Sequence, residues 1–281
     1  MLWRGRSGSS NVEDRRGMSA GGLATGGGVV GLIVYLLYSF LGGDPSQLPD
    51  LNQQMQSGKE LTTEQSAAED TMAQFVSVVL AETETVWEKI FSENEMQYSK
   101  PTLVLFRGQV QSGCGGASAE SGPFYCPADR KLYIDLSFYE ELRNRFHASG
   151  DFAMAYVIAH EVGHHVQNLL GISAKVQRMR ERLSESEYNK YSVKLELQAD
   201  YYAGVWAHFA DKENQIVEEG DIEEALNAAS AVGDDNIQKQ SRGYVVPDAF
   251  THGTSEQRRT WFYKGYNSGT LQGGNTFEAD I

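Results

Sequence analysis

The stretch that decides the fold is DFAMAYVIAHEVGHHVQNLL, residues 151–170. Its apolar residues recur at helical spacing, Asp151 suits the N-cap position, and Gly171 suits the position after the last turn. We therefore expect one helix, with the pentapeptide His-Glu-Val-Gly-His, residues 160–164, well inside it.

The spacing of this H-E-x-x-H sequence has a chemical meaning. Residues four apart lie on one face of a helix, so the imidazoles of His160 and His164 can bind one metal ion. Glu161 projects beside that ion, where it can take a proton from a metal-bound water. The alternative is a polar patch on a solvated helix face, which the apolar neighbours of the motif disfavour. The sequence therefore predicts a catalytic zinc site.

Such a site needs a third protein ligand and an open fourth position. Glu196 and Asp200 are four apart in LELQAD, on a helix predicted over residues 186–210, so both carboxylates face the same way. We predict that Glu196 binds the metal and that Asp200 accepts the free N–H of a ligating imidazole. A surface ion pair with a neighbouring lysine is the alternative for Glu196. His165 points about 100° away from its neighbour around the helix, and we expect it at the surface or behind the ligands.

Several longer blocks extend the pattern over nearly the whole chain: NVEDRRG, CGGASAESGPFYCPADRKLYIDLSFY, HEVGHHVQ, LELQADYYAGVWAH and FTHGTSEQRRTWFYKGY. Together they resemble the neutral zinc metallopeptidase family of bacterial envelopes. H-E-x-x-H followed by E-x-x-A-D is also similar to the glutamate-zincin branch, which includes thermolysin and the CaaX-processing proteases. The resemblance implies a thermolysin-like catalytic core with one zinc ion, and it implies little about the substrate.

The resemblance also gives His252 and Arg258 a possible place in the site. The CaaX-protease-like branch has a Thr-His-Pro segment with an arginine six residues after the histidine, and Arg258 stands at that spacing. His252, Arg258 or both should then approach the active site, where a donor would stabilise the tetrahedral oxyanion. This chain departs from the branch at Gly253, where the branch has proline, and a capping or packing role for His252 is the alternative.

Residues 102–138 differ in composition from the helical segments. Two β-favouring runs, TLVLFRGQV and KLYIDLSFY, lie on either side of a segment rich in turn-forming residues. We expect two strands joined by a long loop. By analogy with zincin-like folds, the second strand, residues 131–138, should border the substrate cleft. Cys114 and Cys126 are the two cysteines of the chain. A bridge between them in an oxidising compartment would be worth roughly 3 kcal/mol.

The N-terminal part predicts a membrane protein. Residues 1–22 are Gly/Ser-rich and carry four arginines, which indicates a disordered leader. Residues 23–41, LATGGGVVGLIVYLLYSFL, hold no charge and come close to the ~20 residues that span a bilayer. A signal peptide is the alternative, but no small-x-small cleavage site follows, so we expect an uncleaved anchor. The arginines before it place the N-terminus in the cytoplasm and the rest outside, on a single-pass inner-membrane protein. Residues 42–65 form a polar linker.

Composition sets the remaining limits. The net charge of −14 argues against a nucleic-acid partner, and 41% hydrophobic residues suffice for a core. We expect an α+β, largely helical, zincin-like domain with a small sheet over residues 66–281. Its predicted activity is zinc-dependent hydrolysis of a peptide or protein substrate. A latent zinc-binding scaffold protein, or a zinc amidase acting on a non-protein amide, are the alternatives, and the sequence names no protein partner.

Overall fold

The structure is a computed structural model that describes residues 1–17 and 63–281. Its longer helices are α3 (Thr63–Glu93), α5 (Asp151–Leu169), α7 (Glu185–Lys212), α8 (Asp221–Ala231) and α10 (Ser255–Ser268). Shorter helices are α4 (Phe138–Asn144), α6 (Ile172–Met179) and α9 (Asp234–Arg242). The strands are β1 (Val12–Asp14), β2 (Thr102–Phe106), β3 (Gln109–Ser112), β4 (Gly115–Ser118), β5 (Phe124–Cys126) and β6 (Lys131–Asp135). The predicted α+β class is confirmed.

A four-stranded sheet with the order β1-β2-β6-β5 supports the helices. The first three of these strands are parallel, and β5 runs antiparallel to β6. Leu103 and Leu105 of β2 face the large core shared with the helices, while Val104 and Phe106 face a smaller cluster on the other side. Because both faces of β2 are covered, its sequence is a continuous apolar run rather than an alternating one.

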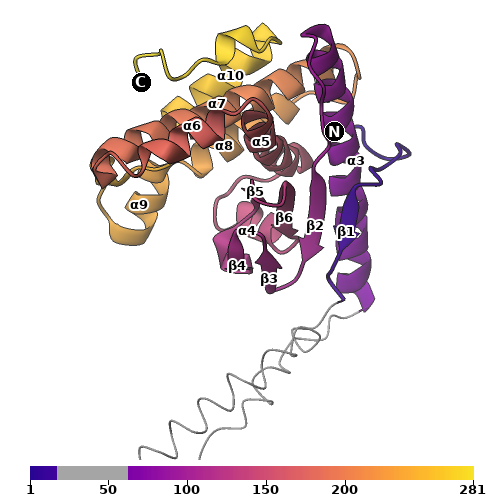
Figure 1. Ribbon diagram of the computed structural model, residues 1–281. Coiled ribbons are helices and arrows are strands. Elements are labelled where there is room, and N and C mark those ends of the chain that lie inside the picture. The colour runs from indigo at the N-terminus through magenta and orange to yellow at the C-terminus, as the bar shows by residue number, and fades with distance from the viewer. Residues whose placement is uncertain (18–62) are drawn as a thin grey trace, which may run out of the picture.

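Helix α5 lies at the centre of the molecule, with the sheet on one side and α7 and α8 on the other, while α3 runs alongside β1 and β2 (Figure 1). It contacts α3, α7 and α8, and nearly every residue along it is buried. Its first half, residues 152–159, is apolar on all sides, which is typical of a helix that a domain buries completely. The helix that carries H-E-x-x-H is therefore also the main element of the core.

The two helices predicted over residues 151–170 and 186–210 agree with α5 and α7. At the start of α10, Thr254 and Gln257 cap the helix reciprocally. The N-cap of α5 was predicted wrongly: it is Gly150, and Asp151 belongs to the first turn. The predicted long loop between the two strands contains the hairpin β3–β4 and the strand β5. These elements, like α4, α6 and α9, are too short for hydrophobic periodicity to reveal.

The prediction of a disordered leader is wrong for residues 1–17. β1 extends the sheet by pairing with β2, and the Leu2 amide donates to the carbonyl of Ile216 at 2.7 Å. Trp3 is buried and packs edge-on against Phe75 of α3, with ring centroids 5.4 Å apart. The segment has few apolar residues, but each of them meets a partner on the domain, so it gains enough burial to be ordered.

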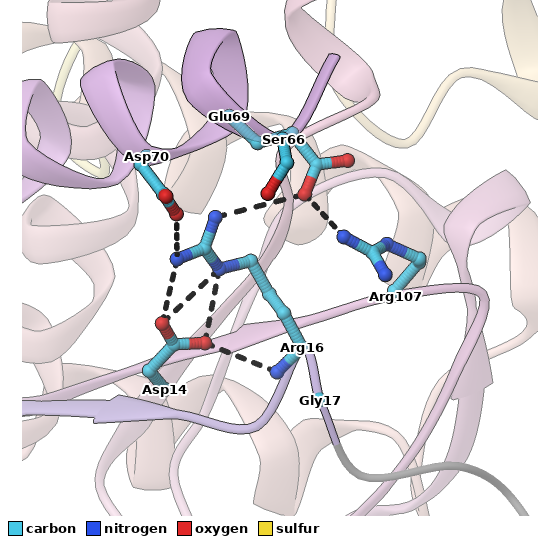
Figure 2. A pocket seen from close by; sticks show the side chains of 7 residues that line it. All are labelled: Asp14, Arg16, Gly17, Ser66, Glu69, Asp70 and Arg107. Carbon is cyan, nitrogen blue, oxygen red and sulfur yellow. Dashed lines mark hydrogen bonds and ion pairs between the residues drawn. The ribbon is translucent and has the colours of Figure 1, made fainter. Parts of the chain in front are cut away.

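Arginines expected to lie near a membrane instead form ion pairs within the protein. Arg16 reaches Asp14 of β1 at 2.7 Å and Asp70 of α3 at 3.0 Å, as Figure 2 shows. Glu69 is shared between Arg16 and Arg107, and the group surrounds a hollow of about 440 Å³ (Figure 2). This network fastens the end of the N-terminal segment to the beginning of α3.

The predicted anchor, residues 23–41, lies outside the described residues, as does the predicted linker 42–65 apart from its last three residues, which begin α3. None of the helices within the described ranges is long and apolar enough to cross a membrane. The pairing of β1 with β2 places residues 1–17 on the same side of any membrane as residues 63–281. It therefore conflicts with the predicted topology, in which a single span separates these two parts.

Candidate metal centre and active site

The three predicted metal ligands converge between α5 and α7. His160 and His164 project from α5 toward Glu196 of α7, and one ligand atom from each residue lies within 4.8 Å of the others. The Nε2 atom of His160 is 3.1 Å from one carboxylate oxygen of Glu196, and the Nε2 atom of His164 is 3.4 Å from the other. The sequence prediction named these three side chains, and the structure brings them together.

The separations suit zinc. Zinc binds histidine nitrogen and carboxylate oxygen at about 2.0–2.2 Å, so two ligand atoms in a tetrahedral site lie roughly 3.3–3.6 Å apart. The observed 3.1 and 3.4 Å are close to that range. Two imidazoles with one carboxylate are also a ligand set that catalytic zinc uses, with the fourth position left for water or substrate. The residues present therefore fit the metal.

Gly163 explains how the two helices come this close. A β-carbon on this residue would lie 2.9 Å from the carbonyl oxygen of Ala199 and 3.1 Å from its α-carbon. Because α5 and α7 touch backbone to backbone at this point, the histidines on either side of Gly163 can reach Glu196. A larger residue would force the helices apart at the metal centre.

Each ligating imidazole has an oxygen acceptor on its far side. The Nδ1 atom of His160 is 2.8 Å from Asp200, as predicted, and the Nδ1 atom of His164 is 2.9 Å from the side-chain oxygen of Gln167. Both rings then donate from Nδ1 and keep the Nε2 lone pair for the metal. Gln167 was not predicted, although its position three residues after His164 puts both on one helix face.

Asp200 is fully buried and lies at the centre of a polar network. It accepts from the Tyr156 hydroxyl at 2.6 Å and from Arg258 at 2.8 and 3.0 Å. Burial alone would raise the pKa of Asp200, but the charges of Arg258 and His160 outweigh it and lower the pKa to about 2. Asp200 therefore stays ionised at neutral pH.

Arg258 does not have the cleft-facing position that we expected from the resemblance. It is 4% exposed, lies behind His160, and donates to Asp200 from Nε and Nη2, while Nη1 donates to the carbonyl of Val232 at 3.3 Å. The face of α10 that carries it packs on α7, so its side chain points into the protein. Its position is that of a residue that orients Asp200, rather than one that contacts substrate.

The negative charge gathered at the centre favours a cation. Burial alone would lower the pKa of His160, but Asp200 and Glu196 raise it to about 9. The same carboxylates that stabilise a protonated imidazole would stabilise a divalent ion in its place. Binding of zinc would then displace a proton from the site.

Glu161, the predicted base, is 8% exposed and lies beside the ligands. Burial raises its pKa, and the charges of His164 and His160 oppose this effect. β5 packs against α5, and the backbone of Tyr125 lies near enough to Glu161 to lower its pKa, which places the edge strand of the sheet next to the base. The strand expected to border the cleft, β6, is internal, and β5 takes that position.

His252 lies close enough to Glu196 for their charges to interact, and its side chain is half exposed. Its Nδ1 atom is 3.1 Å from one carboxylate oxygen of Asp234, while the other oxygen accepts the amides of Thr251, His252 and Gly253 at 2.6–3.0 Å. Burial would lower the pKa of His252, but Asp234 and Glu196 raise it. Asp234, at the start of α9, is a further residue of this site that the sequence analysis did not predict.

Two other predictions concern residues near the centre. Cys114 and Cys126 form the predicted disulfide, with α-carbons 5.8 Å apart, and this bridge ties β5 to the β3–β4 turn. His165 is neither at the surface nor behind the ligands. It is fully buried between the Tyr125 hydroxyl and the Ser99 carbonyl, and burial lowers its pKa to about 4.

A helix bearing H-E-x-x-H, a glutamate from the next long helix and a buried glutamate beside the histidines are the residue pattern that zinc metallopeptidases of the glutamate type use. The chain belongs to the family described as "Putative neutral zinc metallopeptidase", whose pattern matches residues 1–277.

Two relatives show how similar the chain is to other proteins, and over what length. The chain is 48% identical to "Uncharacterized protein YpfJ" of Escherichia coli (strain K12) over 290 residues, covering 100% of both chains. It is 46% identical to "Uncharacterized protein Rv2575" of Mycobacterium tuberculosis (strain ATCC 25618 / H37Rv) over 192 residues, which is 65% of this chain and 64% of that protein. No solved structure matches the chain.

Proposed function

We propose that the protein is a zinc-dependent endopeptidase that uses Glu161 as its general base. The observation that carries this proposal is the position of Glu161, buried beside the converging side chains of His160, His164 and Glu196. When bound there, zinc would polarise the scissile carbonyl and lower the pKa of the attacking water toward ~7. Glu161 accepts the proton of that water and later delivers it to the leaving amine.

Burial gives Glu161 the property that this role requires. A carboxylate of ordinary pKa holds a proton too weakly to carry it from water to an amine. Burial raises the pKa of Glu161 and so moves it toward the working pH. The neighbouring imidazoles limit this rise and keep the group able to ionise.

His252 is the group best placed to stabilise the oxyanion. Its side chain is half exposed at the rim, and the charge of His252 acts on Glu196. Asp234 fixes the ring through Nδ1, so Nε2 is the nitrogen left to donate toward the cleft. A single donor of this kind contributes roughly 3–4 kcal/mol to transition-state stabilisation.

An extended peptide would find a backbone partner in β5. This strand is one edge of the sheet and lies next to Glu161, so a substrate strand can add to it through main-chain hydrogen bonds. Such recognition reads the backbone rather than particular side chains, which suits an enzyme that cleaves unfolded protein.

The test compares the wild-type protein with Glu161→Gln, using casein as an unfolded substrate and measuring bound zinc in both. We expect equal zinc content, and cleavage by the wild type alone. A wild type that binds zinc and cleaves neither casein nor other amides would identify a latent scaffold. Cleavage of a cell-wall amide but not of casein would identify an amidase. The exposed Glu187 of α7 gives a matched control, Glu187→Gln, which should behave as wild type.

We also propose that residues 1–17 and 63–281 lie together on the oxidising side of a bacterial inner membrane. The Cys114–Cys126 bridge supports this location, since such bonds persist outside the cytoplasm. Alkylation of intact cells with thiol reagents, followed by reduction and a second label, tests it. Free thiols in freshly lysed cells would place the domain in the cytoplasm instead.

A further inference from the structure

Two buried glutamine side chains connect the metal centre to residues 272–277. Gln167 of α5 is 0% exposed, and Gln198 of α7 is 3% exposed. The side-chain oxygen of Gln167 lies 2.9 Å from the Nδ1 atom of His164, and its Nε2 atom donates to the side-chain oxygen of Gln198 at 3.1 Å. Gln198 donates in turn from Nε2 to the carbonyl of Gly274 at 2.7 Å. A chain of three hydrogen bonds thus leads from a candidate metal ligand to a backbone carbonyl.

The direction of this chain is fixed at its far end. A backbone carbonyl can only accept, so Gln198 turns its NH₂ group toward Gly274 and its oxygen toward Gln167. Gln167 then uses both of its N–H bonds, one to Gln198 and one to the carbonyl of Leu195 at 2.6 Å. Only its oxygen remains for His164, so the Nδ1 atom of that ring carries the proton. The Nε2 lone pair of His164 is then left for the metal.

Residues 272–277, the docked segment, lie tightly against α7. The hydroxyl of Thr276, which is 0% exposed, donates to the carbonyl of Lys194 at 2.6 Å. Gly274 lies where a side chain does not fit, because a β-carbon there would be 2.7 Å from the Cδ1 atom of Tyr201. The docked segment is therefore packed on the helix that carries the third candidate ligand, and its carbonyl is held at the end of the glutamine chain.

We propose that Gln198 and the docked segment position His164 for zinc, by holding Gln167 in the one orientation that leaves the metal-facing nitrogen of the ring free. Gln198 is a positioning residue, since it acts on the ligand through Gln167. The inference rests on the zinc site of the proposed function. It also has a reciprocal form: zinc should hold the docked segment on α7 by the same factor by which the docked segment strengthens zinc binding.

The physical reason is that a glutamine amide can turn over. If Gln167 turned by 180°, its NH₂ group would face His164 and favour the tautomer with the proton on Nε2, the nitrogen that has to bind the metal. The oxygen of Gln198 and the carbonyl of Leu195 both oppose this turn, because each needs a donor. Without Gln198 the carbonyl of Leu195 remains, so the correct orientation is weakened but not abolished.

The first test measures the zinc affinity of the full-length protein by competition with a chelator. Gln167→Leu should lower the affinity about 10–100-fold, as loss of the contact behind a ligating imidazole does. Gln198→Leu removes one hydrogen bond from Gln167 and should lower it by about 3–10-fold. Gln198→Glu still presents an oxygen to Gln167 and should keep the affinity of the wild type. A merely structural role would make both variants of Gln198 lose affinity, and that result would overturn the proposal.

A further variant disturbs the docked segment without changing any hydrogen-bonding side chain. In Gly274→Ala the new β-carbon would meet the ring of Tyr201, so the carbonyl has to shift away from Gln198. We expect a loss of zinc affinity in the same range as that of Gln198→Leu. Asp280→Asn, at an exposed position just after the docked segment, is the matched control and should bind zinc as the wild type does. Wild-type affinity in both Gln198→Leu and Gly274→Ala would contradict the proposal.

Amide hydrogen exchange of residues 272–277, followed by mass spectrometry with and without zinc, tests the reciprocal form. In the wild type, zinc should slow this exchange by about the factor that separates the zinc affinities of wild type and Gln198→Leu. In Gln198→Leu the exchange should no longer respond to zinc, because the connection to His164 is interrupted. An equal response in both proteins would show that zinc and the docked segment are not coupled through Gln198.

The failure of this inference can be told from the failure of the proposed function. None of these measurements uses catalysis, so a latent zinc-binding protein would give the same results as an active peptidase. A wild type that binds no zinc would overturn both proposals. A wild type that binds zinc and cleaves casein, with variants of Gln198 and Gly274 that bind zinc equally well, would overturn this inference alone.

Discussion

Arg258 and Asp200 form an ion pair directly behind the first metal ligand. Both residues are buried, and two guanidinium nitrogens of Arg258 lie 2.8 and 3.0 Å from the two carboxylate oxygens of Asp200. Asp200 also binds the Nδ1 atom of His160, and the Nη2 atom of Arg258 itself lies 3.3 Å from that nitrogen, so the arginine acts on the first ligand both directly and through Asp200. This relationship separates residues that hold the site from residues that face the substrate.

Arg258→Ala should therefore affect stability and metal binding before chemistry. Loss of one partner of a buried pair costs about 3–5 kcal/mol, and loss of the orienting contact on an imidazole lowers metal affinity about 10–100-fold. Chemical denaturation and zinc competition with a chelator measure the two effects. Arg259→Ala, at the exposed neighbouring position, is the control. Unchanged zinc affinity in Arg258→Ala would return Arg258 to the cleft-facing role inferred from sequence.

Asp200→Ala should resemble Arg258→Ala in metal affinity, and added zinc should partly restore its activity. The structure adds an effect that spacing alone did not predict: the variant leaves Arg258 charged and unpaired in the core. We expect it to be less stable than Asp200→Asn, which keeps an acceptor for His160. Activity titrated against zinc, together with urea denaturation of both variants, distinguishes the two contributions. Full activity of Asp200→Ala without added zinc would show that orientation of His160 is unimportant.

Glu196→Ala should remove a direct metal ligand. Its effect on zinc affinity should exceed that of Asp200→Ala, and so be more than roughly 100-fold, while the helical fold is retained. Zinc content after dialysis and far-ultraviolet circular dichroism provide the measurements. The control is Glu185→Ala, at an exposed position on the same helix. If Glu196→Ala keeps its zinc through dialysis, the third ligand must be another residue.

The residues of the metal centre could largely be predicted because their spacing lies within single helices. Histidines four apart on one helix, and carboxylates four apart on the next, are fixed by helical geometry in sequence alone. Gln167 follows the same rule and could have been found in the block HEVGHHVQ. Asp234 could not, because α9 and the loop before α10 bring it to His252 through tertiary contacts without any regular spacing.

The sequence did not determine in which direction a side chain points or which distant strands pair. The family resemblance placed Arg258 near the site, but only the packing of α10 on α7 shows that it faces inward. β1 has three residues and pairs with a strand far along the chain, so no local signal marks it. A charged, glycine-rich segment was for this reason interpreted as disordered, although its few apolar residues are part of the core.

His252→Ala should lose activity while keeping its zinc. A donor to the oxyanion acts after water attacks, so kcat should fall by roughly 10²–10³ with KM and zinc content unchanged. Asp234→Asn should lower kcat less, since it weakens the positioning of His252 but leaves the ring present. Steady-state kinetics at saturating zinc tests both variants. Normal turnover by His252→Ala would assign that residue to packing, and the oxyanion donor would have to be another group.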